Sequence, residues 1–170
     1  MKHKQEIIAL LIFFAVSLAF AYPVLQKIGN WGIHDWDQHL MYNAVPKNTI
    51  LEFKQFPLWN PYYCGGNVML ANPQSGFLNP LFIFVLLFGE VIGLKLLIII
   101  YLIIGLLGMF LLARHLKISL ISSYLTAFLF MLSGLYAMRV SIGHTVWMQV
   151  ALMPYVFLFY LKSLENTRTQ

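Results

Sequence analysis

Two carboxylates stand two residues apart in the segment 34–39, which reads His-Asp-Trp-Asp-Gln-His. They are Asp35 and Asp37, two of only six acidic residues in a chain of 170. In an extended or turn conformation, positions i and i+2 point the same way, so both carboxylates can face one ligand. Such a pair suits a divalent cation such as Mg²⁺ or Mn²⁺, or general base catalysis by one carboxylate under repulsion from the other.

A helical conformation of the same segment has a different consequence. Asp35 and His39 then stand four residues apart and share one face of the helix. An alternative without chemistry is a solvated turn in which the aspartates cap a short helix. Acid-X-acid triplets are common, so the spacing alone leaves these interpretations open.

A second candidate is the stretch 56–61, which reads Phe-Pro-Leu-Trp-Asn-Pro and is followed by Tyr62, Tyr63 and the pair Gly65-Gly66. The prolines favour extended backbone before them, and the glycines permit a tight turn. Exposed Trp and Tyr rings on such a frame either anchor a chain at the lipid headgroups or stack on the apolar face of a sugar.

Arg139 and His144 flank a turn at Gly143, directly after the uncharged run that ends at residue 138. An arginine in this position either extends its charged end to the lipid headgroups, or pairs with a phosphate or with an aspartate of the segment 34–39. His144 gains interest because we expect it on the same side of the membrane as Asp35 and Asp37.

Composition identifies the setting of these residues. Hydrophobic residues make up 60% of the chain, charged residues 10%, and the mean hydropathy is +0.75. These values are typical of an integral membrane protein. The net charge of +5 is spread over short segments, so it indicates membrane topology and not nucleic-acid binding. Cys64 is the only cysteine, which excludes an intrachain disulfide.

The apolar runs predict an all-α integral membrane fold: a helical bundle with about four transmembrane helices, a short interfacial helix and a long first exterior loop. We expect one membrane domain over residues 1–170, with spans at 7–25, 96–113, 118–138 and 145–161. The exterior loop covers 26–76. The run 77–88 is too short for a comfortable span, so we expect it to lie at the interface.

Charge predicts the orientation in the cell membrane. A cytoplasmic N-terminus and a run 77–88 that does not cross place Arg114, Lys117, Lys162 and Arg168 inside, as the positive-inside rule requires. The loop 26–76 is then extracytoplasmic. If the run 77–88 crossed, Arg114 and Lys117 would lie outside.

These motifs occur in a familiar order: the segments 35–39, 56–62, 65–67 and 70–75, followed by 105–109, 133–134 and 143–144. Their order and spacing resemble the N-terminal part of large multi-spanning membrane proteins of the GT-C glycosyltransferase superfamily, the YfhO-like group in particular. The resemblance covers nearly the whole chain. Its most specific part is the stretch 56–61 with the glycine turn that follows.

The resemblance implies a membrane glycosyltransferase, or its N-terminal portion, that transfers a sugar from a polyprenyl-phosphate donor to an extracytoplasmic acceptor. Asp35 or Asp37 would then be the general base on the acceptor hydroxyl, or a metal ligand. Arg139 and His144 would contact the donor phosphate. The expected substrate-binding residues are His39, Trp59, Asn60, Arg139 and His144.

Members of the group have many more spans, so the resemblance also implies a fragment whose missing helices a partner chain could supply. The expected partners are the lipid bilayer and a polyprenyl-phosphate-linked sugar, and no nucleic acid. An alternative is a non-catalytic membrane protein that binds lipid, glycan or a partner subunit through its aromatic loop. A channel or transporter is less well supported, because the predicted spans carry almost no ionisable residues.

Overall fold

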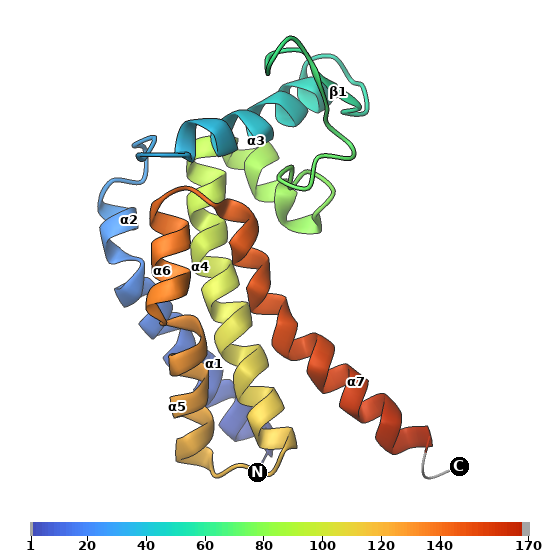
Figure 1. Ribbon diagram of the computed structural model, residues 1–170. Coiled ribbons are helices and arrows are strands. Elements are labelled where there is room, and N and C mark those ends of the chain that lie inside the picture. The colour runs from blue at the N-terminus through green and yellow to red at the C-terminus, as the bar shows by residue number, and fades with distance from the viewer. Residues whose placement is uncertain (1, 168–170) are drawn as a thin grey trace. The chain divides into compact units, whose positions relative to one another are not determined.

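The computed structural model describes the backbone of residues 2–167 and the side chains of residues 5–165. Helices dominate, which confirms the all-α prediction. The elements are α1 (Lys2–Phe20), α2 (Tyr22–Gln26), α3 (Trp36–Leu51), β1 (Trp59–Asn60), β2 (Asn67–Val68), η1 (Pro80–Phe82), α4 (Ile83–His115), α5 (Leu120–Met131), α6 (Gly134–Ser141), η2 (Thr145–Leu152) and α7 (Met153–Thr167), as Figure 1 shows.

Contacts divide the chain into two compact units. The first comprises the described residues of Met1–Tyr22, Ile99–Ala137 and Met148–Gln170. The second comprises Pro23–Ile98 and Met138–Trp147. The carboxylates, Arg139, His144 and the aromatic loop all belong to the second unit.

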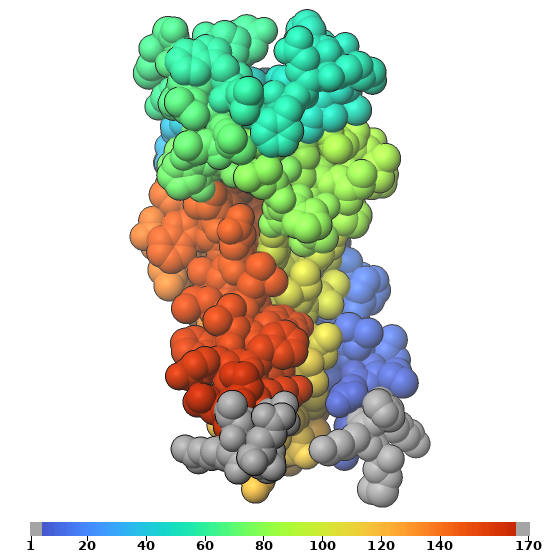
Figure 2. All heavy atoms as spheres, turned by 90° about the vertical axis from the view of Figure 1, so that its right-hand side faces the viewer, coloured from blue at the N-terminus to red at the C-terminus, as the bar shows by residue number. Residues whose placement is uncertain are grey.

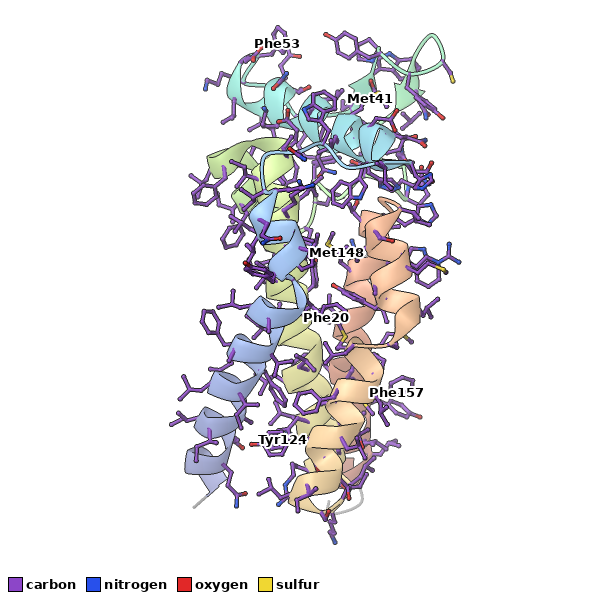
Figure 3. The ribbon with its side chains drawn as sticks, turned by 90° about the vertical axis from the view of Figure 1, so that its left-hand side faces the viewer. Phe20, Met41, Phe53, Tyr124, Met148 and Phe157 are labelled. Atoms are coloured by element: carbon purple, nitrogen blue, oxygen red, sulfur yellow. The ribbon has the colours of Figure 1, made fainter. Side chains whose placement is uncertain are left out.

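Aromatic rings form the core of the first unit. Phe13 of α1 packs its ring 5.7 Å from that of Phe110 in α4, and 5.6 and 5.9 Å from those of Tyr124 and Phe128 in α5. Figure 3 shows Tyr124 directed inward among these helices. The pairs of Phe13 with Phe110 and Phe128 are edge-to-face, an arrangement that stabilises apolar interiors beyond the area that the rings bury.

Glycines allow other side chains of this unit to approach α4 closely. A Cβ atom on Gly105 would lie 2.3 Å from the sulfur of Met131, and one on Gly108 would lie 2.4 Å from the ring of Tyr155. The Tyr155 hydroxyl donates a hydrogen bond of 3.0 Å to a carbonyl of α4. Small residues are used in this way where helices pack without a hydrophobic driving force between them.

Three helical segments are long and apolar enough to cross a membrane: Pro80–His115, Leu120–Ser141 and Thr145–Glu165. The apolar segment Gln5–Phe20 is shorter. Three of the four predicted spans therefore coincide with helices of the required length and composition, whereas the fourth, at 7–25, does not. The uncharged run there does not form one helix, because α1 ends at Phe20 and α2 begins at Tyr22.

The predicted interfacial helix at 77–88 is corrected at its start. Helix begins at Pro80, where Asn79 Oδ1 accepts a hydrogen bond of 2.9 Å from the Leu81 N–H, so residues 77–79 are not helical. Its end is as predicted, because Gly89 has φ 79° and ψ 167°, which interrupts α4. A Cβ on Gly93 would lie 2.7 Å from the Phe84 carbonyl, so the short helix packs back against the helix after the break.

The predicted exterior loop contains a helix and a small hairpin. Helix α3 occupies Trp36–Leu51, in line with the helical interpretation of the segment 34–39. Strands β1 and β2 pair antiparallel, with Trp59 opposite Val68. The turn between them includes Gly65 and Gly66, with φ 77° and 121°, which confirms the predicted glycine turn.

Two lysines attach this loop to the N-terminal part of α4. Lys47 of α3 forms an ion pair of 2.5 Å with Glu90. Lys95, which is buried, donates to the carbonyl of Lys27 at 2.9 Å and to that of Asn30. These contacts hold the backbone on both sides of the segment 34–39.

Candidate functional site

The backbone just before α3 lies against the turn that follows α6. The Asp35 N–H donates to the Ile142 carbonyl at 3.0 Å. The indole N–H of Trp36 is shared between the carbonyls of Val140 and Ser141, each at 3.1 Å. Residues more than a hundred positions apart are therefore joined through main-chain atoms, which fixes their relative position.

Gly143 makes this close approach possible. Its φ of 99° lies in the region that side-chain-bearing residues rarely adopt. A Cβ atom at this position would lie 2.5 Å from the Trp36 nitrogen and 2.7 Å from the Asp35 carbonyl carbon. Glycine is thus required both by the turn and by the backbone packed against it.

Three side chains form a continuous hydrogen-bonded series on this frame. Asp35 Oδ2 lies 2.8 Å from His144 Nε2, and His144 Nδ1 lies 3.2 Å from an Nη1 of Arg139. A guanidinium can only donate, so His144 Nδ1 accepts and His144 Nε2–H donates to the carboxylate. A neutral imidazole satisfies both contacts. The Asp35 side chain remains 52% exposed, and its second oxygen makes no hydrogen bond within the described part of the chain.

Arg139 is held on its other side by an aromatic ring. Its guanidinium carbon lies 4.8 Å from the centre of the Trp147 ring, in a cation–π contact. Its Nε is buried and has no hydrogen-bond partner among the described residues. Among the described residues, Arg139 therefore meets an imidazole and an indole, and no carboxylate forms an ion pair with it.

His39 lies beneath this series. It is only 1% exposed, and its Nδ1 lies 3.1 Å from the Thr145 hydroxyl oxygen. Burial lowers the pKa of His39, and proximity to His144 lowers it further, while Asp35 opposes the shift. The ring is therefore neutral near pH 7. This position favours a role in placing its neighbours over direct contact with a substrate.

Asp37 does not join Asp35. Its side chain is exposed and accepts a hydrogen bond of 2.7 Å from the adjacent Gln38 N–H. The His39 N–H donates to the Asp35 carbonyl at 3.0 Å, so the backbone is already helical here. Residues two apart on a helix project to nearly opposite sides, so the carboxylates diverge. Of the two conformations considered from the sequence, the helical one is found.

A metal ion at the two aspartates stays a prediction without added support. The part of the chain that the structure describes holds no group of three or more His, Cys, Asp or Glu side chains that could bind a metal ion. Two diverging carboxylates do not fit the converging oxygen ligands that Mg²⁺ requires. We therefore assign no chemical step to a metal.

Trp59 and Asn60 lie apart from this series. Trp59 is 53% exposed, whereas Asn60 is buried and its Oδ1 accepts a hydrogen bond of 2.9 Å from the Tyr62 N–H. Trp59 lines a cavity with the C-terminal half of α3. Asp35 precedes the first turn of the same helix, about 20 Å away along its axis.

Sequence reasoning missed three residues of the site: Trp36, Thr145 and Trp147. Trp36 stands between the two aspartates and joins the turn, and Trp147 follows His144 by three positions. The clustering of aromatic residues next to the ionisable ones was a signal for both tryptophans. Thr145 carried none, because a lone threonine has no distinctive spacing.

Comparisons with known proteins give no relative for this chain. No protein-family profile, no curated protein and no solved structure matches it.

Proposed function

We propose that this chain is a membrane-embedded glycosyltransferase, or the N-terminal portion of one, that transfers a sugar from a polyprenyl-phosphate donor to an extracytoplasmic acceptor. The observation that supports it best is the series Asp35–His144–Arg139, in which a carboxylate, an imidazole and a guanidinium are in consecutive contact. Sugar transfer needs a base for the acceptor hydroxyl and a cation for the departing phosphate. The resemblance of the sequence motifs to the GT-C superfamily supports the same reaction.

In the proposed reaction, the free oxygen of Asp35 accepts the proton of the acceptor hydroxyl. The acceptor oxygen then forms a bond to the anomeric carbon of the donor sugar. The bond between that carbon and the phosphate oxygen breaks, and the polyprenyl phosphate leaves with the electron pair. Arg139 stabilises the developing charge on the phosphate through its remaining N–H groups.

His144 is a positioning residue in this proposal. Both of its ring nitrogens already have partners, so it orients the Asp35 carboxylate and holds Arg139 in place. This differs from the expectation that His144 contacts the donor phosphate directly. The proton taken by Asp35 passes to water, because the carboxylate is half exposed.

The test compares Asp35→Asn with Asp37→Asn. Asparagine at position 35 keeps an oxygen for His144 but cannot take a proton. Membranes containing each variant are given radiolabelled undecaprenyl-phosphate-linked glucose, galactose or N-acetylglucosamine, and the label transferred to acceptors is counted. We expect Asp35→Asn to reduce transfer at least about 100-fold, and Asp37→Asn to change it less than about threefold.

The amount of inserted protein is measured for every variant, which separates catalysis from folding. Undiminished transfer by Asp35→Asn contradicts the proposal. A second candidate, a non-catalytic protein that binds lipid, glycan or a partner, is favoured by the exposed rings of Phe53, Phe56, Trp59 and Tyr62. It predicts that Trp59 is needed and Asp35 is not.

A further inference from the structure

A cavity of about 670 Å³ lies between the C-terminal half of α3 and the chain that follows it. One wall includes Asn48 and Thr49 of α3 and Glu52, the C-cap of that helix, and the opposite wall belongs to residues 53–62. Figure 2 shows these segments, in teal and green, at the surface of their unit. The volume is within the range of small-molecule sites, which is about 300–1,000 Å³.

One wall of the cavity offers unused hydrogen-bonding groups. Asn48 and Glu52 lie one helical turn apart and therefore share a face of α3. Gln55 lines the same cavity just after the helix. Within the described residues, none of these three side chains makes a hydrogen bond or an ion pair with the protein, so their amide and carboxylate groups remain available to a ligand.

The other wall offers aromatic rings in fixed positions. Trp59 is held by strand pairing with Val68, and its ring lies directly on Gly66. A Cβ atom on Gly66 would lie 2.3 Å from that ring. Phe53 and Tyr62 are also largely exposed, and Figure 3 shows Phe53 projecting from the end of α3.

Charge limits the kind of ligand. Of the residues that the structure describes, Glu52 is the only charged one that lines the cavity, and no lysine, arginine or histidine does so. An anion such as a phosphate or a uronic acid is therefore disfavoured. A lipid chain is disfavoured as well, because it would leave three polar side chains without partners. An uncharged pyranose has an apolar face for the rings and hydroxyl groups for the amides and the carboxylate.

We propose that this cavity binds an uncharged sugar residue of a carbohydrate chain. The sugar lies about 20 Å along α3 from Asp35. Resting on the proposed glycosyltransferase function, this assigns the cavity to a distal part of the acceptor, several sugar residues from the hydroxyl that reacts. Binding itself does not depend on catalysis.

The protein in lipid nanodiscs is titrated with cellohexaose, maltohexaose and mannohexaose, and with hexagalacturonate as the anionic counterpart, by isothermal calorimetry. We expect at least one neutral hexasaccharide to bind, with hexagalacturonate at least tenfold weaker. Trp59→Ala and Asn48→Ala each weaken binding at least tenfold. Trp31→Ala, which removes another exposed indole outside the cavity, leaves it unchanged.

Two further measurements complete the test. We expect Asp35→Asn to keep its affinity for the hexasaccharide. If this variant also transfers sugar as fast as the unsubstituted protein, the proposed function is contradicted and the proposed sugar site is not. The emission of Trp59 is obtained as the difference in fluorescence between the unsubstituted protein and Trp59→Phe. We expect brominated lipids in the nanodisc not to quench this emission. Quenching by these lipids, failure of all three neutral hexasaccharides to bind, or equal binding by Trp59→Ala and Asn48→Ala overturns the inference.

Discussion

At the scale of single residues, His144 determines what Asp35 can do. The imidazole donates to one carboxylate oxygen and accepts from Arg139, so a single neutral tautomer connects an anion to a cation. The carboxylate keeps one oxygen for another partner, and its orientation is fixed by a residue more than a hundred positions away. Such support is what a functional side chain needs in order to act in one geometry.

His39 makes the stability of the protein sensitive to pH. Its pKa is lowered in the folded state, so the unfolded chain binds more protons as the pH falls below the usual histidine value of about 6.5. We expect the free energy of unfolding to decrease below that pH. In His39→Asn, which has a polar atom near the position of Nδ1 but does not titrate, the decrease is smaller.

Thermal unfolding of both proteins in nanodiscs between pH 7.5 and 5.5 measures this difference. Asp35 and His144 face His39 and are present in both proteins, so the two proteins differ only at position 39. Parallel curves for the two proteins would contradict the assignment of the pH dependence to His39.

At this scale the sequence predicted which residues belong to the candidate site better than it predicted the contacts between them. It placed Asp35, Arg139 and His144 on one side of a membrane, and it placed Asp35 and His39 on one face if the segment was helical. It did not predict that His144 bridges Asp35 and Arg139, because this contact depends on how a turn packs against a helix start. Only tertiary structure determines that packing.

At the scale of elements, α3 is the main difference between expectation and structure. Residues 36–51 include Pro46 and β-branched residues, and α3 buries polar residues such as His39 and Asn43 together with Leu40. The sequence of this segment therefore has no amphipathic period, and it predicts part of a long loop. Helix α3 depends on tertiary packing more than on intrinsic propensity, which is common in proteins.

The turn at Gly143 gives a test at this scale. Gly143→Ala introduces both an unfavourable φ and a contact of 2.5 Å with the Trp36 nitrogen, so we expect it to lower the free energy of unfolding by about 2–5 kcal/mol. Gly65→Ala has the unfavourable φ but open space around the new methyl, so we expect a loss of about 1 kcal/mol.

Chemical unfolding in detergent measures both variants, and Gly29→Ala, with nothing within 4 Å of the new Cβ atom, serves as the control. Equal losses for Gly143→Ala and Gly65→Ala would show that the backbone of Trp36 does not lie against the turn. The turn would then not hold His144 against Asp35 either.

At the scale of the whole molecule, the sequence predicted the membrane segments from run length, and three of them have the length and composition to cross. The observed helix boundaries differ from the predicted ones because helices end at turns and caps, which hydropathy does not detect. The span predicted at 118–138 instead extends over Leu120–Ser141 and is interrupted between α5 and α6. Hydropathy gives no signal for such an interruption, which depends on the local backbone.

Whether the segment 77–88 crosses the membrane determines on which side the loops before and after α4 lie. Between Cys64 and Leu116 the chain crosses once if only the part of α4 after Gly89 spans the bilayer, and twice if 77–88 also crosses. We expect a single crossing, since it leaves Arg114 and Lys117 in the cytoplasm. Native Cys64 is exposed, and Leu116 is exposed as well.

A membrane-impermeant maleimide applied to intact cells should therefore label Cys64 and should not label Leu116→Cys in a Cys64→Ser background. Inverted vesicles should give the reverse pattern. This comparison does not depend on whether α1 spans the membrane, because α1 precedes both positions. Labelling of both cysteines from the same side would mean that 77–88 crosses. Labelling of Cys64 only from the cytoplasm would place Asp35 on the inner side, where an extracytoplasmic acceptor cannot reach it.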